Sequence, residues 1–462
     1  MDEPACPGCR ELANRVAALE TQNAELTRKL EAALRAGKRQ AAPFRKGPPK
    51  AEPKTPGRKS GDQHGTHGQR PPPPPDQIRE CHEANLPDAC PHCQGTIVET
   101  KIEEQFQTEI PRQPIHRKFR IHIGHCQSCG KPARGRHPLQ TSNALGAAAS
   151  QIGPDAQAAV VDLHTRMGLS HGKVVTVLDS LFGIKLTRGA SAQINLRAAT
   201  KLEPDFQLIC NDLRNSEEIA ADETGWRLGG RPAWLHVGVG DRATAYFIDP
   251  QRSTEVLERV IGRDWSGILT HDGFSSYDRF AAATHQQCLA HVLRRARDLL
   301  ATATRGAVHF PQRVVALFTE AIHLRNRHLL DARAVTLKHL REAGDDFELR
   351  LLDLLTPPRA VPEYTTLSNH LAKHFHEWFA FAFDPKIEPT NWKAEQAIRP
   401  AVVNRKVWGG NRTEAGARAQ SALMSVIETC RRQTKSIVDY ISGTLRAFGN
   451  RLLPHPVLLL GR

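Results

Sequence analysis

The first regular pattern along the chain is a seam of apolar positions that advances in alternating steps of four and three residues. Its members are Leu12, Val16, Leu19, Asn23, Leu26, Leu30 and Ala33. This spacing is the a/d pattern of a short coiled coil, and an asparagine on the seam favours two helices paired in register. The pattern therefore predicts a homodimer formed through residues 10–36. A single amphipathic helix packed on its own protein is the alternative.

Residues 154–210 carry a second helical pattern. Apolar positions recur at helical spacing on both sides of a break at Gly183, which is typical of a helix-turn-helix and equally of two short packed helices. In a helix-turn-helix, Arg188, Asn195 and Arg197 are expected to face a groove of nucleic acid. The pattern leaves both interpretations open.

After residue 215 the pattern changes to short strands. The segments EEIAAD, PAWLHVGVG, ATAYFID and SGILTHDG read as strands, and STEVLERVIG has the helical period. Three adjacent antiparallel strands, a crossover helix and a further strand predict the start of a ribonuclease H-like core. Asp222 and Asp272 then end two strands that lie side by side, so both carboxylates are expected at one sheet edge.

The segment NWKAEQAIRP offers a third acid. Asn391, Glu395 and Arg399 are spaced i, i+4, i+8 on one helical face. Pro400 is expected to limit this helix. Two divalent ions about 3.5–4 Å apart carry more positive charge than two carboxylates balance, so Glu395 is expected to join the aspartates while Arg399 meets phosphate. Because carboxylate oxygens are hard ligands, the ions are expected to be magnesium or manganese.

Two CxxC pairs lie between residues 78 and 140. They are Cys90 with Cys93 and Cys126 with Cys129. Two such pairs complete the tetrahedral sulfur shell that structural zinc prefers. The segment KFRIHI between them alternates as a strand does, so a zinc ribbon with a hairpin between the pairs is predicted. Unligated cysteines in a small core are the alternative.

Other cysteines and histidines are substitute zinc ligands. Cys81, His82 and His92 lie close to the first pair in the sequence. Cys6 and Cys9 form a third CxxC pair without a partner pair nearby. Because they precede the predicted coiled coil, two copies in a dimer are one way to complete a zinc site with them.

Composition adds a class of partner. Lys and Arg total 63 against 49 Asp and Glu, which leaves a net charge of +14, and such a surplus points first to nucleic acid. Residues 38–77 are rich in proline and basic groups and poor in large apolar side chains, so they are expected to stay unfolded. This tether either lies along nucleic-acid phosphates through its positive charge or serves as a passive spacer. No apolar run approaches the ~18 residues of a membrane span, and the first residues, MDEPACPGCRELANR, lack the pattern of a secretion signal.

Five segments, taken in order, resemble a known family. They are ADETGW around Asp222, THDGFSSY around Asp272, QCLAHVLRRAR, NWKAEQAIRP around Glu395 and NRKVWGGNRTEAGARA. They look like the successive blocks of the insertion sequence 66 family of bacterial DDE transposases. The resemblance implies a ribonuclease H-like catalytic domain in which Asp222, Asp272 and Glu395 hold two magnesium or manganese ions, with an α-helical insertion between the last two.

The resemblance also implies an activity and partners. A DDE transposase binds the terminal inverted repeats of its element, hydrolyses a phosphodiester at the end and joins the freed 3′-hydroxyl to target DNA. Accessory proteins encoded by the same element are further partners, and a cytoplasmic, nucleoid-associated protein is expected. A non-catalytic zinc-ribbon DNA-binding protein is one alternative. A tyrosine recombinase is another, with Tyr440 as the tyrosine nearest the terminal arginines.

A multidomain α+β organisation follows from these patterns. The expected segments are 1–37 for the first CxxC pair and the coiled coil, 38–77 for the tether, 78–140 for the zinc ribbon, 141–215 for the helical domain, 216–300 for the first part of the catalytic core, 301–385 for the helical insertion and 386–462 for the last part of the core and the tail.

Two small groups of residues near the expected catalytic site have more than one interpretation. Arg405, Lys406 and Trp408 follow the Glu395 helix, and they suit phosphate contacts beside an aromatic platform, or else a charged patch with a core tryptophan. With Asn391 and Arg399 they complete the predicted DNA contacts.

The segment Cys288-Leu-Ala-His291 is the second group. It suits half a metal site, a thiol nucleophile, or a short strand running into a helix. The roles of Cys288 and His291 stay open at this stage.

Overall fold

The structure is a computed structural model, and the residues it describes are 15–23, 71–108, 110, 113–146, 151–302, 308–356, 362–449 and 453–460. The chain divides into two units, Met1–Pro111 and Arg112–Arg462. Residues 15–23 are helical and exposed. The rest of the predicted coiled coil, Cys6 with Cys9, and most of the tether lie outside the described residues.

The second unit begins with an antiparallel hairpin of β1 (Ile123–His125) and β2 (Pro132–Arg134). This hairpin encloses the Cys126–Cys129 turn. The sequence placed a hairpin between the two cysteine pairs, and that placement is wrong, because β1 is the only strand among the described residues between them. Ile123 is 55% exposed, so the apolar alternation of this segment buries no face and supports only a short strand.

A helical layer follows the hairpin. Its elements are α2 (Pro154–Val161), the π-helix η4 (Asp162–Arg166), α3 (His171–Phe182), α4 (Arg188–Lys201) and α5 (Glu203–Arg214). The predicted break at Gly183 is confirmed: Gly183 ends α3 with a φ of 66°, in the left-handed region that glycine favours. Asn195 is buried, since it lies on the face of α4 that packs in the core with Ile194 and Ala198. The prediction that Asn195 faces a groove is therefore wrong.

A five-stranded mixed sheet forms the centre of the second unit. Its strands and connections are β3 (Glu218–Leu228), β4 (Arg231–Val239), β5 (Thr244–Asp249), α6 (Glu255–Ile261), β6 (Ile268–His271), the 3-10 helix η5 (Ser275–Arg279) and β7 (Thr284–Gln287). The spatial order is β5-β4-β3-β6-β7. β3, β4 and β5 are antiparallel, whereas β6 and β7 run parallel to β3.

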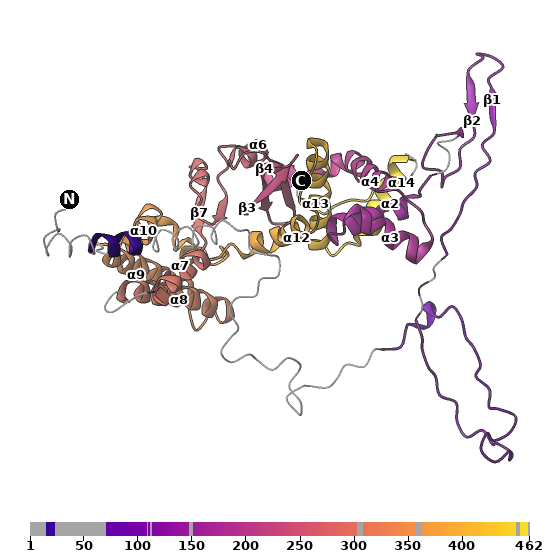
Figure 1. Cartoon of the computed structure of the whole chain (residues 1–462), viewed down its shortest axis with the longest axis horizontal. Helices are drawn as coiled ribbons and strands as arrows, with labels where there is room; N and C mark the ends of the chain where they lie inside the picture. The colour runs from indigo at the N-terminus through magenta and orange to yellow at the C-terminus, as the bar shows by residue number, and fades with distance from the viewer. Residues whose placement is uncertain are drawn as a thin grey trace, which may run out of the picture. The chain divides into compact units, whose positions relative to one another are not determined.

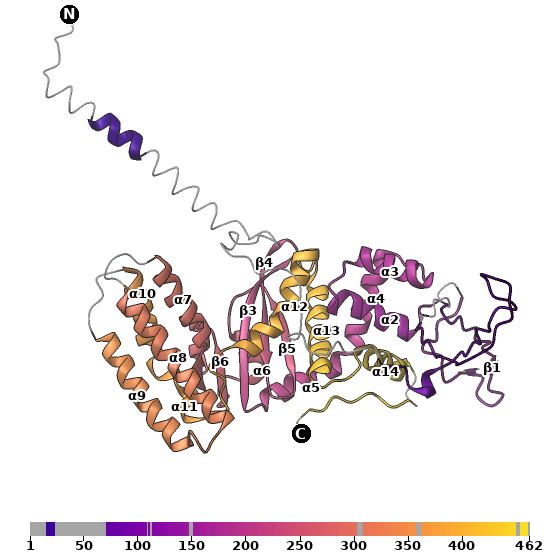
Figure 2. The same ribbon diagram turned by 90° about the horizontal axis from the view of Figure 1, so that it is seen from below.

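The two faces of the sheet pack against different helices. On β3, Ile219 and Ala221 belong to the core shared with α5 and α6, while Ala220 belongs to the core shared with α12 (Trp392–Trp408). This alternation follows from the period of two along a strand. Figure 2 shows α12 and its successor α13 (Glu414–Arg432) lying beside β3, β4 and β5. The last helix is α14 (Ile437–Gly449).

Helix α13 covers the edge strand β5 with a row of hydroxyl groups. Main-chain N–H groups of β5 donate to side chains of α13 in three pairs: Thr244 to Thr429 (3.2 Å), Tyr246 to Ser425 (2.9 Å) and Ile248 to Ser421 (3.1 Å). The match is geometric, because four residues of helix rise about 6 Å and two residues of strand about 6.6 Å. These contacts satisfy the strand donors that a sheet edge otherwise leaves open.

A helical insertion separates β7 from α12. Its elements are α7 (Leu289–Thr302), α8 (His309–Leu330), α9 (Leu337–Leu355), α10 (Pro362–Lys373), the 3-10 helix η6 (Phe375–Glu377) and α11 (Ala380–Phe383). It has its own core, in which Phe318, Phe347, Trp378 and Phe379 pack together. Figure 1 shows these helices at one end of the sheet and α2, α3 and α4 at the other.

Candidate active site

The sheet brings Asp222 and Asp272 to matching positions on neighbouring strands. β3 and β6 pair in parallel with Ala220 opposite Thr270, and each aspartate lies two residues further along the chain. The prediction that these strands lie side by side is confirmed. Because Ala220 faces α12, the period of two turns Asp222 toward the same helix.

One detail of that prediction is wrong: Asp222 does not end its strand. β3 continues to Leu228 because it forms a hairpin with β4, which pairs with it from Ala220 opposite Val239 to Leu228 opposite Arg231. The parallel pairing with β6 stops at Ala220. Asp222 therefore lies where β3 loses its parallel neighbour, and Asp272 directly follows β6.

Asn391 fixes the start of α12 against the sheet. Its side-chain amide donates a hydrogen bond of 2.8 Å to the carbonyl oxygen of Ala221, the residue before Asp222. Asn391 is fully buried, and Glu395 lies one helical turn further on. α12 thus begins against the strand residue that precedes Asp222, and Glu395 follows on its first turn.

The carboxylates influence one another electrostatically. The pKa of Asp222 is raised to about 7, mainly because the group is buried and next because the negative charge of Asp272 lies near it. The charges of Glu223 and Glu395 raise it further. Three acids from different segments therefore repel one another electrostatically, and a bound divalent cation would reduce this repulsion.

Glu223 is a neighbouring acid that the sequence did not single out. It points to the opposite face of β3 from Asp222, where Arg252 donates to its Oε1 at 2.8 Å and the Tyr277 hydroxyl donates to its Oε2 at 2.9 Å. Burial raises the pKa of Glu223, and the charge of Asp272 adds to the increase, while Arg252 opposes it. No sequence signal links these partners, because they lie on separate segments.

Cys288 joins the starts of two helices. It follows β7 directly and precedes α7, so the interpretation of a short strand running into a helix is confirmed. Its Sγ accepts the main-chain N–H of Asn391 at 3.1 Å. Burial raises the pKa of the Cys288 thiol, which disfavours a thiolate nucleophile.

Two groups of side chains among the described residues place three ligand atoms within 4.8 Å of one another. One is His271, His285 and Glu377, and the other is Cys288, His291 and Glu395. Glu395 therefore belongs to a ligand-like group. Asp222 and Asp272 belong to neither group, so the three predicted metal ligands do not form a group of this width among the described residues.

The first of these groups has a complete hydrogen-bond chain of its own. His285 Nε2 bonds the carbonyl of Phe280 at 2.9 Å, and its Nδ1 meets His271 Nε2 at 2.9 Å. His271 Nδ1 in turn accepts from the N–H of Gly273 at 3.2 Å. These bonds use the ring nitrogens of both histidines, so the pair is satisfied without an ion.

Helix α12 continues through Pro400 to Trp408, so the prediction that Pro400 limits the helix is wrong. The helix survives because Ala397, Ile398 and Ala401 are buried on the face that packs on the sheet, while Pro400 lies on the exposed side.

Four of the five predicted DNA contacts, Arg399, Arg405, Lys406 and Trp408, therefore belong to the Glu395 helix itself, and the fifth, Asn391, is fully buried at its start. Arg399 and Lys406 are exposed and Arg405 is half-buried. Arg405 Nη1 donates to Thr224 Oγ1 at 3.5 Å, which ties the last turn of the helix to β3.

The two tryptophans of α12 have different surroundings. Trp408 packs edge-on against Trp226 and stacks on His164, which matches the core interpretation of its sequence. Trp392, next to Asn391, is 49% exposed. The exposed tryptophan of this helix is thus Trp392, three residues before Glu395, and a count of helical positions from the buried Ala394 and Ala397 would have placed it at the surface.

The cysteine pairs of the predicted zinc ribbon form similar turns, each within its own unit. In the first, the N–H of Gln94 donates to the carbonyl of Cys90 at 2.9 Å; in the second, the N–H of Gly130 donates to that of Cys126 at 2.8 Å. Gln94 and Gly130 both have a φ in the left-handed region. Main-chain N–H groups lower the pKa of Cys90 and Cys126. Zinc binding stays a prediction.

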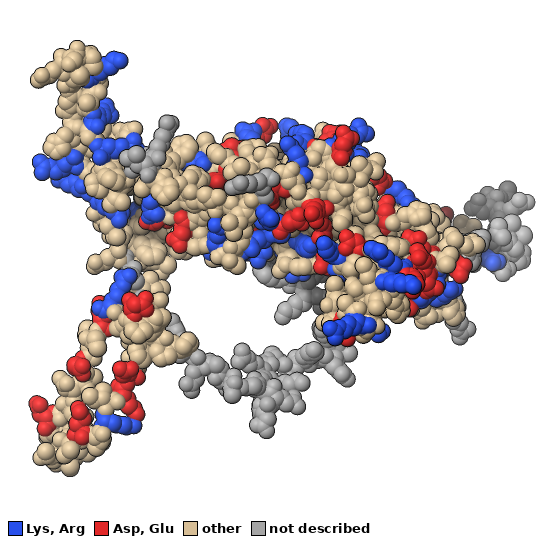
Figure 3. Space-filling model, turned by 180° about the vertical axis from the view of Figure 1, so that it is seen from behind, with Lys and Arg blue, Asp and Glu red and all other residues tan. Residues whose placement is uncertain are grey.

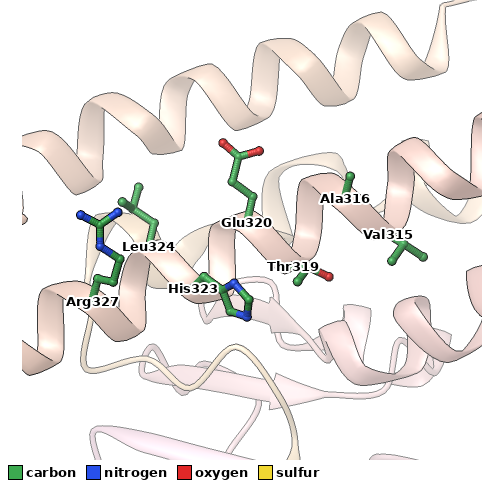
Figure 4. Close-up of a pocket in the computed structure, with 7 residues that line it drawn as sticks. All are labelled: Val315, Ala316, Thr319, Glu320, His323, Leu324 and Arg327. Carbon is green, nitrogen blue, oxygen red and sulfur yellow. The ribbon is translucent and has the colours of Figure 1, made fainter.

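The surface offers further information on charge and shape. Residues 113–146 contain six Lys and Arg and no acid, and Figure 3 shows basic side chains on the arm that carries β1 and β2. A pocket lies along α8 between Val315 and Arg327 (Figure 4), and it contains none of the predicted site residues. No described helix is long and apolar enough to cross a membrane.

Comparison with known proteins places the chain in a class. Residues 149–419, more than half of the chain, match the family described as Transposase IS66 family. The chain is a transposase. It belongs to the IS66 family, as the resemblance of its motifs predicted.

Two relatives come from Sinorhizobium fredii. "Uncharacterized protein y4hP" is 23% identical over 442 residues, which cover 85% of this chain and 75% of the relative. "Uncharacterized protein y4qI" is 23% identical over 294 residues, 57% of this chain and 53% of the relative. Their names add no activity to what the family gives.

Proposed function

We propose that the chain is a DDE-type transposase that binds the terminal inverted repeats of its element and catalyses metal-dependent cleavage and strand transfer of DNA. The observation that carries this proposal is the arrangement of Asp222, Asp272 and Glu395 on adjoining elements. The sheet order β5-β4-β3-β6-β7 supports a ribonuclease H-like core. The helical insertion between β7 and α12 supports the order of segments that the family resemblance implies.

The side chains suit two divalent ions, magnesium or manganese. Glu395 Oε1 is a buried atom without a hydrogen-bond partner within the described part of the chain, and the pKa of Asp222 is raised by burial and by neighbouring negative charge. Both features disfavour an empty cluster of carboxylates and favour one that holds cations. The chemistry that such ions supply when bound is activation of the attacking water or 3′-hydroxyl and stabilisation of the leaving oxygen.

The residues of the chain have separate tasks in this proposal. Asp222, Asp272 and Glu395 hold the ions, and Asn391 orients the Glu395 helix through Ala221. The exposed Arg399 and Lys406 on the same helix meet DNA phosphates. The basic residues around β1 and β2 extend this electrostatic attraction.

The tyrosine recombinase alternative is disfavoured by burial. The chain has four tyrosines, and their exposures are 1% for Tyr246, 2% for Tyr277, 6% for Tyr364 and 4% for Tyr440. Tyr440 also donates a hydrogen bond to Asp205 at 2.9 Å. A nucleophilic tyrosine has to reach a phosphodiester, and these hydroxyls do not. The non-catalytic alternative is disfavoured by the retention of three adjoining acids.

The test is a cleavage assay on DNA that carries the inverted repeats flanking the gene. We expect the full chain to cut this DNA in magnesium or manganese and to stop when a chelator is added. Asp222→Asn and Asp272→Asn should bind the repeat and fail to cut it. Asp249→Asn is the matched control, because Asp249 lies on the same sheet and pairs with the exposed Arg259. Nicking by the Asp222→Asn variant would refute the proposal.

A further inference from the structure

The segment from Cys288 to His291 lies directly against the Glu395 helix. The Cys288 thiol accepts the N–H of Asn391, which is the residue at the N-terminus of α12. This bond holds the starts of α7 and α12 together. His291 is the third residue of α7, and Glu395 lies four residues after Asn391 in α12. Both residues therefore lie about one helical turn from the Cys288–Asn391 contact.

His291 and Glu395 face each other across a gap that a hydrogen bond does not close. The distance from His291 Nε2 to Glu395 Oε1 is 3.8 Å, beyond the usual range for a hydrogen bond. His291 Nδ1 and Glu395 Oε1 are buried and have no hydrogen-bond partner in the described part of the chain. Asn391 Oδ1, at the same junction, is a third buried atom of this kind. Of these three atoms, Glu395 Oε1 is the one that borders the gap, and an ion between it and His291 Nε2 satisfies it.

The spacing suits two ligands of one ion. Nitrogen and oxygen ligands lie about 2.0–2.2 Å from a first-row divalent ion, so two of them on the same ion are about 3–4 Å apart. We propose that His291 is a ligand of the divalent ion that Glu395 holds. The inference rests on the proposed function, and it adds an imidazole to a set otherwise made of carboxylates.

The identity of the ligand has a consequence for the choice of ion. Carboxylate oxygens suit magnesium, whereas imidazole nitrogen suits first-row transition metals better. A site with His291 therefore binds manganese more tightly than magnesium by a larger margin than a site of carboxylates alone. Cys288 lies in the same group of ligand atoms, but its sulfur already accepts the N–H of Asn391, so it acts on the junction rather than on the ion.

The test uses manganese as the probe on the full chain. Pulsed electron paramagnetic resonance detects a nitrogen bound directly to Mn²⁺, and isothermal titration gives the affinity. We expect the nitrogen signal in the wild-type chain and its loss in His291→Asn and His291→Ala, with Mn²⁺ binding weakened about tenfold or more. His323→Asn is the matched control, because His323 is exposed on α8, and it should keep both properties.

The outcomes separate this inference from the proposed function. A nitrogen signal that persists in both His291 variants, with the fold intact by circular dichroism, overturns the inference. The same conclusion follows if Glu395→Gln weakens Mn²⁺ binding and the His291 variants do not, and the proposed function then stands. If Asp222→Asn and Glu395→Gln both bind Mn²⁺ as the wild type does, the proposed metal site itself is refuted.

Discussion

Asn391 holds the main-chain carbonyl of Ala221 through a hydrogen bond of 2.8 Å. This contact joins the N-terminus of the Glu395 helix to the strand of Asp222, although Asn391 and Ala221 are 170 positions apart in the sequence. It explains how an acid beyond a long helical insertion meets an acid on the first strand of the sheet.

We expect Asn391→Ala to lower DNA cleavage by tenfold or more while the chain stays folded. The matched control is Asn404→Ala. Asn404 is a buried asparagine of the same helix, and it donates to the carbonyl of Thr165 at 2.7 Å. Both variants lose one buried hydrogen bond, at a cost of about 1–3 kcal/mol in unfolding free energy. Equal cleavage by the two variants would contradict a role of Asn391 in positioning Glu395.

The stability of the metal-free chain should depend on Asp222 and pH. The pKa of Asp222 is about 7 in the folded chain against an ordinary value of 3.8, so the folded state keeps a proton that the unfolded chain loses. Stability therefore falls as pH rises from about 4 to about 7. The Asp222→Asn variant lacks this loss. At about pH 8 in a chelator its free energy of unfolding should exceed that of the wild type by several kcal/mol at most, and its melting temperature should be higher.

This prediction is checked by thermal unfolding at about pH 4 and pH 8. The difference between the two chains should grow with pH and shrink when manganese is added, because the ion stabilises the ionised carboxylate. A wild-type chain that gains stability over Asp222→Asn as pH rises without metal would contradict the raised pKa.

Arg252 should set the pH range of activity. Its guanidinium bonds the buried Glu223 carboxylate, whose negative charge raises the pKa of Asp222. Arg252→Gln removes the positive charge that lowers the pKa of Glu223 and leaves Tyr277 as its donor, so Glu223 and Asp222 together should hold their protons to higher pH and the onset of cleavage should move to higher pH. Arg259→Gln, which removes an exposed arginine paired with Asp249, is the control. An unchanged pH profile in Arg252→Gln would argue against this coupling.

Trp392 and Trp408 should respond in opposite ways to substitution. Trp392 is exposed and lies three residues before Glu395, so Trp392→Ala is expected to weaken DNA binding by about 1–3 kcal/mol, the usual range for stacking on a base, with little change in melting temperature. Trp408→Ala removes a side chain packed between Trp226 and His164 and should destabilise the fold. Binding titrations and thermal unfolding of both variants distinguish these roles. A reversed result would support the aromatic platform first assigned to Trp408.

The cysteine pairs should bind zinc. We expect about one zinc per chain by elemental analysis after dialysis, with clear loss in Cys93→Ser and Cys129→Ser. Cys210→Ser is the control, because Cys210 is buried in α5 and lies outside both pairs. An unchanged zinc content in the Cys93→Ser variant would contradict zinc binding by these cysteine pairs.

Much of the central sheet follows from patterns within short segments. The order of three adjacent strands, a crossover helix and a further strand predicted that β3 and β6 lie side by side. The end of β3 was not predictable in this way. Its continuation past Asp222 depends on the hairpin with β4, a contact with another segment.

Residue roles that depend on distant partners were the hardest to predict. Pro400 lies inside α12 because the buried side of that helix packs on the sheet, and this packing overrides the local preference of proline. Glu223 escaped notice because Arg252 and Tyr277 come to it from other segments. His291 was left open for the same reason, since its facing residue Glu395 lies 104 positions further along the chain.

The hydroxyl row of α13 has a consequence for how copies of the chain meet. The outward N–H groups of β5 are already bound by Ser421, Ser425 and Thr429, so this border of the sheet has no donors to offer an incoming strand. Two copies of the chain therefore cannot associate by extending this sheet across the β5 border.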